Sequence, residues 1–99
     1  MSVLDIATAT ADDFEPRRND AFGLCTPAGE VTVTLAEVRR LGQALRKGGA
    51  FALTFVAKGA PVLPQAIYSV GHPALGALEM FLVPIGPMAG GMGYEAVFT

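Results

Sequence analysis

Val31-Thr32-Val33-Thr34-Leu35 alternates aliphatic with hydroxyl side chains, and this stretch decides the fold class. A period of two places the aliphatic side chains on one face of a strand and the hydroxyls on the other, which is typical of a half-buried antiparallel strand. The same period continues in Phe51–Val56, where alternate residues are large and apolar. The centre of the chain is therefore predicted to be β structure.

Shorter alternating runs extend this pattern toward both ends of the chain, at Ala21–Cys25, Ala66–His72, Leu78–Val83 and Tyr94–Phe98. Together they predict about six strands, with Ala21–Cys25 at an edge. Turn-forming glycines and prolines separate the runs so closely that crossover helices have little room, which favours antiparallel pairing. Because six short strands leave two edges to close or cover, we expect a small antiparallel β-barrel, with a two-sheet β-sandwich as the alternative.

A short helix is expected near the N-terminus. Thr10 has the character of an N-cap, and a pair of acids follows it where the helix dipole favours negative charge. Pro16 limits this helix to about one or two turns, and Phe14 would anchor it as a lid over one end of the sheet. We expect one domain, with residues 1–18 as an N-terminal segment and residues 19–99 as the barrel.

Leu35–Arg46 admits two interpretations. Its apolar residues could form one stripe of a helix: Leu35, Val38, Leu41 and Leu45. We prefer a strand that continues to about Arg39, followed by a loop.

The composition indicates a soluble protein with ample apolar residues for a core. The chain has 99 residues, 52% of them hydrophobic, and a formal net charge of −2, which argues against a dedicated polyanion binder. The longest apolar stretch, 75–93, is interrupted by a glutamate, two prolines and several glycines. A membrane-spanning helix needs about 20 largely uninterrupted apolar residues. With no secretory signal at its start, the chain is expected to be cytoplasmic, with no membrane association.

The sequence offers few residues for catalysis or metal binding. It has one cysteine, Cys25, and one histidine, His72, whereas a transition-metal site usually takes three or four such ligands. A Cys–His nucleophile would need these side chains to meet, and the more economical interpretation makes Cys25 a small buried residue and His72 a turn residue. Glu79 and Glu95 fall between apolar neighbours, so we expect them to face solvent rather than to act as an acid–base pair. We therefore predict no enzymatic activity, metal or cofactor.

One uncharged segment, residues 82–92, favours protein binding. It contains two methionines and two prolines, and an exposed tip of this kind would make an adaptable apolar surface. If the segment folds back instead, it caps one end of the barrel, and the sequence weighs the two alternatives equally. The candidate partner-binding residues are Pro84, Ile85, Pro87, Met88 and Met92. The leading hypothesis is a non-enzymatic interaction or assembly protein that binds a protein partner or its own copy.

A basic stretch supports an alternative, a barrel that binds a small ligand or single-stranded nucleic acid. The candidate contacts are Arg39, Arg40, Arg46 and Lys47. The negative net charge and the lack of a recognition motif argue against nucleic acid. The aromatic residues are better explained as core: Phe51, Phe55, Phe81, Tyr94 and Phe98.

The C-terminal half carries segments rich in proline, glycine and large apolar residues: Leu63–Tyr68, His72–Gly76, Met80–Pro87 and Tyr94–Phe98. In these segments the chain resembles a family of small bacterial proteins, a domain of unknown function associated with phage-tail-collar-like genes. Gln65-Ala66 departs from the family pattern, which has a glycine before the strand. The resemblance implies a structural or assembly accessory to a tail-like or surface-fibre protein, and it supplies no catalytic residues.

Overall fold

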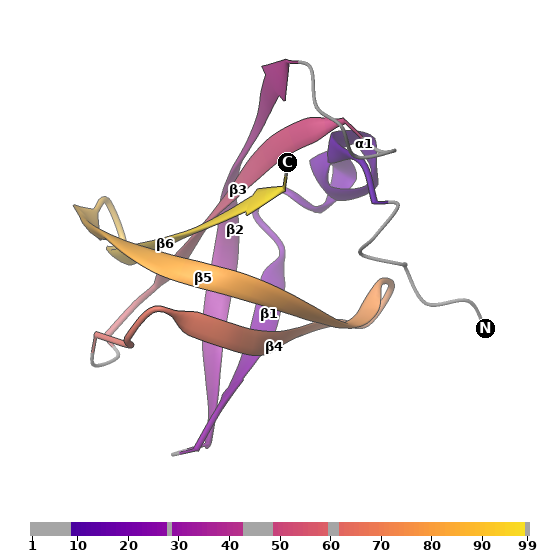
Figure 1. Cartoon of the computed structure of the whole chain (residues 1–99). Helices are drawn as coiled ribbons and strands as arrows, with labels where there is room; N and C mark the ends of the chain where they lie inside the picture. Colours follow the sequence, from indigo (N-terminus) through magenta and orange to yellow (C-terminus); the bar gives the residue numbers. More distant parts are fainter. Residues whose placement is uncertain (1–8, 28, 43–48, 60–61, 99) are drawn as a thin grey trace.

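The computed structural model describes residues 9–27, 29–42, 49–59 and 62–98. Its elements are α1 (Ala11–Phe14), the 3₁₀-helix η1 (Glu15–Arg17), β1 (Ala21–Thr26), β2 (Gly29–Gly42), β3 (Ala50–Ala57), β4 (Ala66–His72), β5 (Gly76–Met88) and β6 (Gly91–Phe98). All strand pairs are antiparallel, in the order β1-β2-β3-β6-β5-β4, and β4 pairs back onto β1 (Figure 1). The strands thus form one sheet that closes into a ring. The expected all-β class with six antiparallel strands and a short N-terminal helix is confirmed, and the sheet is single rather than the two of a sandwich.

The strand β1 is not an edge, although the sequence predicted one there. It pairs with β2 along its whole length, and Gly23, Leu24 and Cys25 also pair with Gly71, Val70 and Ser69 of β4. That second ladder is the shortest of the six and closes the ring, so we call it the seam. The edge prediction was wrong because the partner of β1 on this side lies far along the chain, where no local signal points to it.

The strand β2 continues past Arg39 to Gly42, paired with β3. Leu35 and Val38 are both buried, because a register shift between Leu35 and Glu37 marks a β-bulge that adds one residue to the inward period. A bulged strand can therefore imitate the spacing of a helical stripe. The helix interpretation is wrong for the described part of Leu35–Arg46, and the loop expected beyond it falls in residues 43–48, outside the described residues.

The inside of the ring is filled by inward-facing side chains from all six strands, among them Phe22, Leu24, Val33, Leu35, Leu53, Phe55, Val70, Leu78, Met80 and Leu82. One end of the ring is closed by α1. Phe14 is fully buried there, and its ring centroid lies 5.8 Å from that of Phe51 and 6.3 Å from that of Phe98. The predicted lid, anchored by Phe14, is confirmed. No helix in the described ranges is long and apolar enough to cross a membrane.

Two tyrosines hold the connection between β3 and β4 at the other end of the ring. The Tyr94 hydroxyl accepts a hydrogen bond from the Leu63 amide at 2.9 Å, and the Tyr68 hydroxyl donates to the Pro64 carbonyl at 2.6 Å. Both rings are buried. A buried tyrosine normally finds a partner for its hydroxyl, so these bonds explain why tyrosine rather than phenylalanine fills these positions.

The strand β3 is buried on both faces, and every residue from 50 to 57 is covered. Its outer face is sheltered by an ion pair between Arg39 of β2 and Glu95 of β6, whose side-chain atoms approach to 3.3 Å. Arg39 pairs with Ala52, and Glu95 pairs with Thr54, so the ion pair crosses over β3 from one neighbouring strand to the other. The ion pair thus covers the part of this outer face that carries Ala52 and Thr54.

Candidate interaction surface

Exposed apolar side chains gather on the outer surface of β4 and β5. Ile67 of β4 is 67% exposed and pairs directly with Phe81 of β5, which is 51% exposed. Farther along β5, Ile85 and Met88 are also exposed. We call Ile67, Phe81, Ile85 and Met88 the apolar face.

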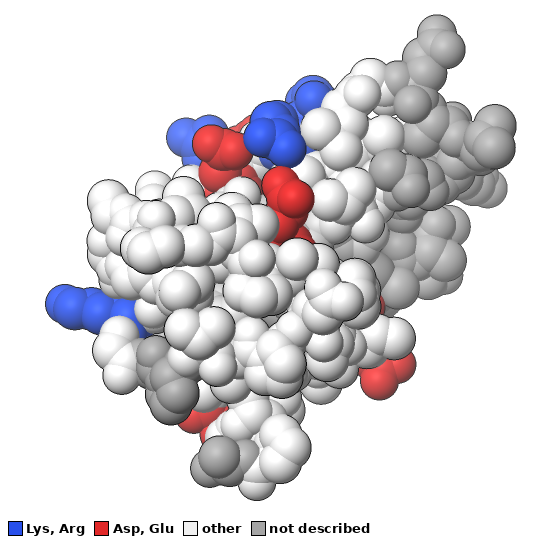
Figure 2. Space-filling view, turned by 60° about the vertical axis from the view of Figure 1, so that its left-hand side comes forward, with Lys and Arg blue, Asp and Glu red and all other residues white. Residues whose placement is uncertain are grey.

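The side of the molecule that carries the β5–β6 hairpin is largely uncharged. Figure 2 shows this side, with acidic and basic side chains gathered along its upper margin and a few more at its left, right and lower edges. The composition explains this, because Glu79 and Glu95 are the only formally charged side chains between Gly59 and Thr99. The exposed area of the four apolar side chains is on the order of 400 Å², within the range of the largest patch on ordinary monomers, which is often functional.

The segment from Pro84 to Met92 forms the end of a regular β-hairpin. The strand β5 continues to Met88 and β6 begins at Gly91, so that only Ala89 and Gly90 form the turn. Prolines and glycines gave this stretch the local signature of a loop. They are tolerated because β5 pairs with β4 only as far as Leu82 and beyond it has β6 alone. A proline, which lacks an N–H, fits a strand whose other side is unpaired.

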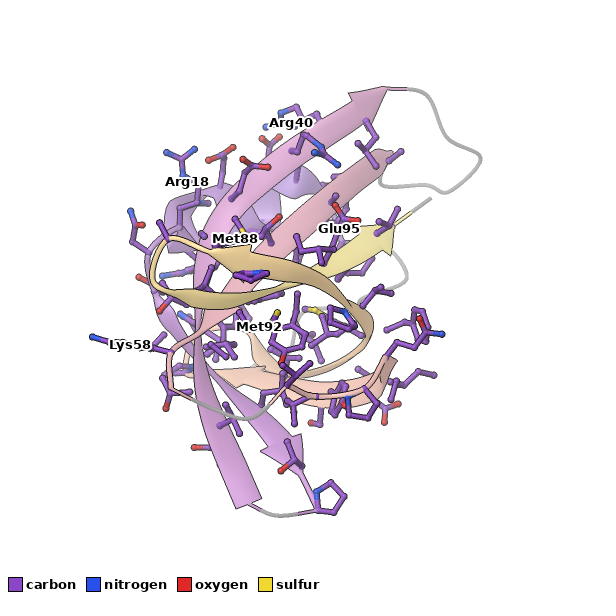
Figure 3. All side chains as sticks on the ribbon, turned by 90° about the vertical axis from the view of Figure 1, so that its left-hand side faces the viewer. Arg18, Arg40, Lys58, Met88, Met92 and Glu95 are labelled. Carbon is purple, nitrogen blue, oxygen red and sulfur yellow. The ribbon has the colours of Figure 1, made fainter. Side chains whose placement is uncertain are left out.

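The five predicted partner-binding residues do not share one face. Ile85, Pro87 and Met88 are exposed, Pro84 is half-buried, and Met92 packs against the core. Figure 3 shows Met88 and Met92 on opposite sides of the hairpin.

Gly93 of β6 leaves room for the side chains of Ile85 and Met88 on the outer surface of the hairpin. A Cβ at Gly93 would collide with the sulfur of Met88 and would lie 3.2 Å from Cγ1 of Ile85. The missing side chain therefore lets Ile85 and Met88 lie flat over the outside of β6.

Sequence reasoning missed Ile67 and Phe81, which make the centre of this surface. It assigned Phe81 to the core, which is wrong, whereas Phe51, Phe55 and Tyr94 are buried as predicted and Phe98 is half-buried against the core. The signal was present in the alternation of residues 78–83, which placed Phe81 on the same side as Glu79 and opposite the leucines.

The predicted basic contacts are not gathered on one face in the described residues. Arg39 is paired with Glu95 on the outside of β3, while Arg40, the next residue on β2, forms an ion pair with Asp12 of α1. The hydrogen bond and charge of Asp12 raise the pKa of Arg40. Arg46 and Lys47 lie outside the described residues.

The His72 ring is engaged through both nitrogens. Its Nδ1 accepts a hydrogen bond from the Ala74 amide at 3.0 Å, so in the neutral ring Nε2 carries the proton and donates to the Asp20 carboxylate at 2.9 Å. The ring also packs on Phe22, with centroids 4.7 Å apart. The side chain is 7% exposed. This histidine thus ties the end of β4 to the start of β1.

The structure does not bring Cys25 and His72 together. Cys25 pairs with Ser69, three positions before His72 on β4, and strand alternation puts the two side chains on opposite faces of the sheet. Cys25 is exposed, so the expectation of a small buried residue is wrong. Within the described ranges, no group of three or more His, Cys, Asp or Glu residues is placed to hold a metal ion.

The two glutamates are also apart. Glu79 is exposed as expected, whereas Glu95 is half-buried and ion-paired. Glu95 pairs across the hairpin with Val83 rather than with Glu79, so they do not form an acid–base pair.

A groove of about 460 Å³ lies on the outside of β2 and β3. Its lining includes Thr32 and Thr34 of β2, Val56 and Lys58 from β3 and its end, and the turn residues Ala89 and Gly90. The volume is that of a small-molecule pocket, though the lining lacks the aromatic side chains common in such sites.

The molecule is therefore an all-β ring of six antiparallel strands with an apolar outer face. It belongs to the family described as a domain of unknown function (DUF6916), which matches residues 9–98 and so includes every strand. Comparisons with curated proteins and with solved structures found no match.

Proposed function

We propose that this protein is a non-enzymatic interaction or assembly protein that binds a protein partner through its apolar face. The observation that supports this is the exposed Ile67–Phe81 pair in the middle of regular, paired strands. Because the ring holds these side chains in place, little conformational entropy is lost when they are covered. An apolar centre with a charged margin is also the usual anatomy of a protein interface.

Contact between side chains is favoured over the addition of a strand to an edge. In the described residues the strands leave only short unpaired stretches, one of which is β5 beyond Leu82. Pro84 and Pro87 lie in that stretch, and their ring nitrogens cannot donate hydrogen bonds to an added strand. A partner would therefore cover the sheet from outside.

The assembly of a tail-like or surface-fibre structure is the specific role that the resemblance implies, and an apolar outer face suits a subunit that is buried in a larger structure. We place the protein in the cytoplasm, because an exposed unpaired thiol such as that of Cys25 is typical of a reducing compartment.

Site-specific photocrosslinking in the cells of origin tests the interaction role. A photoreactive phenylalanine analogue replaces Phe81 in one strain and Glu30, an exposed residue of β2, in a control strain. We expect a defined protein adduct, with another protein or with the same chain, from position 81 and none from position 30. The same adducts from both positions, or none from either, would contradict the proposed interaction role.

Binding of a small ligand is a second candidate, and the groove beside Thr32 and Thr34 is the observation that favours it. A ligand in this groove would shift the amide resonances of Thr32, Thr34 and Gly90 and leave those of Ile67 and Phe81 unchanged. Oligonucleotides at low salt should produce no such shifts, because the two described arginines of the basic stretch are already paired with acids.

A further inference from the structure

Two charged side chains lie beyond opposite ends of the apolar face. Glu79 is exposed near the start of β5, and Lys58 is exposed directly after β3, beside the turn of the β5–β6 hairpin. Figure 3 shows Lys58 projecting outward there. Neither side chain forms a hydrogen bond or ion pair with another described residue. Both charges are thus available to a partner.

The apolar residues lie between these two charges along β5. From Glu79 to Met88 the strand extends for roughly 25–30 Å at about 3.3 Å per residue. Along β5 toward the hairpin turn, the outer surface therefore begins with an acidic side chain, continues with apolar ones and ends beside a basic one. Such a pattern is complementary to itself, because a two-fold rotation places the acid of each copy against the base of the other.

We infer that the partner of the apolar face is a second copy of this chain, in a dimer whose two-fold axis passes near Val83. This rests on the proposed function of the face. In that arrangement Phe81 of each copy packs against Ile85 of the other, because the two residues lie at equal distances along β5 on either side of Val83. Glu79 of each copy then reaches the hairpin end of the other, where Lys58 is found.

The available apolar area agrees with this partner. A standard interface buries about 800 Å² from each protein, somewhat more than half of it apolar. The apolar face supplies on the order of 400 Å², and Val83 and Pro87 lie between its members. The two copies would pack face to face, since Pro84 and Pro87 block main-chain pairing along this part of β5.

Charge reversal tests the dimer. Sedimentation equilibrium of the full chain at low ionic strength should show a monomer–dimer equilibrium. Glu79→Lys alone and Lys58→Glu alone should each raise the dimer dissociation constant about tenfold or more, because each places like charges at both symmetric contacts. The double variant Glu79→Lys/Lys58→Glu should return to within about threefold of the original value, since both contacts regain opposite charges.

Glu30→Lys is the matched control, because it makes the same charge change on an exposed residue of β2 and should leave the dissociation constant unchanged. Thermal unfolding of each variant verifies that the fold is intact. The inference is overturned by a chain that stays monomeric at all concentrations, by a dimer that Glu79→Lys does not weaken, or by a double variant that does not recover. If the chain is monomeric while position 81 crosslinks to another protein, only the dimer fails. If position 81 gives no adduct either, the proposed function fails with it.

Discussion

Gly91 lies where the β5–β6 hairpin packs closely on the backbone at the end of β3. Its φ is +146°, and a Cβ at this position would collide with the carbonyl oxygen of Ala57. Gly90 precedes it with a φ of +95°, yet a Cβ there would lie at an ordinary 3.7 Å from Cγ1 of Val56. Comparing substitutions at these two neighbouring glycines therefore separates the cost of backbone strain from the cost of a steric clash.

We expect Gly91→Ala to destabilise the protein by about 3 kcal/mol or more, because the hairpin must move away from β3 to admit a methyl group. Gly90→Ala should cost only about 1 kcal/mol, the strain of a positive φ on a residue with a Cβ. Urea denaturation of both variants measures the difference. Equal losses in the two variants would contradict the close approach at Gly91.

Single residues also show what the sequence predicts and what it does not. Alternation correctly placed Phe81 on the side of β5 opposite Leu78, Met80 and Leu82. It could not tell which sides another element covers. The outer face of β3 is sheltered by the Arg39–Glu95 ion pair, whereas nothing described covers the outer face of β5 at Phe81. Whether the outer face of a strand is covered depends on the assembled sheet and not on the local sequence, so the centre of the candidate surface was missed.

Among the elements, α1 has only four residues but closes one end of the ring. Its N-terminus is fixed by the Asp13 carboxylate, which accepts a hydrogen bond from the Thr10 amide at 2.8 Å. Four residues cannot form a stable helix alone. Its stability must therefore come from packing, and Phe14 supplies that packing through its contacts with Phe51 and Phe98.

Phe14→Ala should therefore destabilise the fold by about 3–5 kcal/mol, the usual cost of removing a buried aromatic side chain. Arg18→Ala, which removes an exposed ion pair with Glu15, should leave stability nearly unchanged. Thermal unfolding followed by circular dichroism compares the two variants. A small effect of Phe14→Ala would mean that the ring does not depend on its lid.

Elements were predicted correctly where local interactions determine them, and less well where contacts with a partner strand do. Strands with a clear local alternation, such as β3 and β4, were found from the sequence. The strands β5 and β6 were also found, but their extension toward the turn was missed, because prolines and glycines there locally favour a loop, while the strands are stabilised by pairing across the turn. The bulge in β2 was missed for a similar reason, since register is decided by the partner strand.

For the whole molecule, stability is expected to vary around the ring. The strand β3 is buried on both faces and pairs along its length with β2 and β6. The seam between β1 and β4 consists only of the pairs from Gly23 to Cys25. A short ladder should open more often than a long one without unfolding the rest.

Native-state hydrogen exchange should accordingly find the slowest amides in β3 and the opposing part of β6. Amides of Cys25 and Ser69, which pair across the seam, should exchange at least about tenfold faster, through partial opening. Seam amides as slow as those of β3 would show instead that the ring opens only on global unfolding.

The order of strands around the ring, and the dimer that we infer, were both beyond local sequence patterns. Lys58 and Glu79 carry no shared motif, and only the folded ring shows that they stand at opposite ends of one surface. The chain after Gly59 carries only two formal charges, Glu79 and Glu95, and the structure shows that some of its apolar side chains stay exposed on β4 and β5.

The position of Cys25 gives the chain a built-in reporter. It is the only thiol in the sequence, it is exposed, and it lies in the seam. A spin label attached there needs no removal of competing cysteines. Its local motion would follow the opening of the ring, and in a symmetric dimer two such labels would define a single distance that fixes the position of the axis.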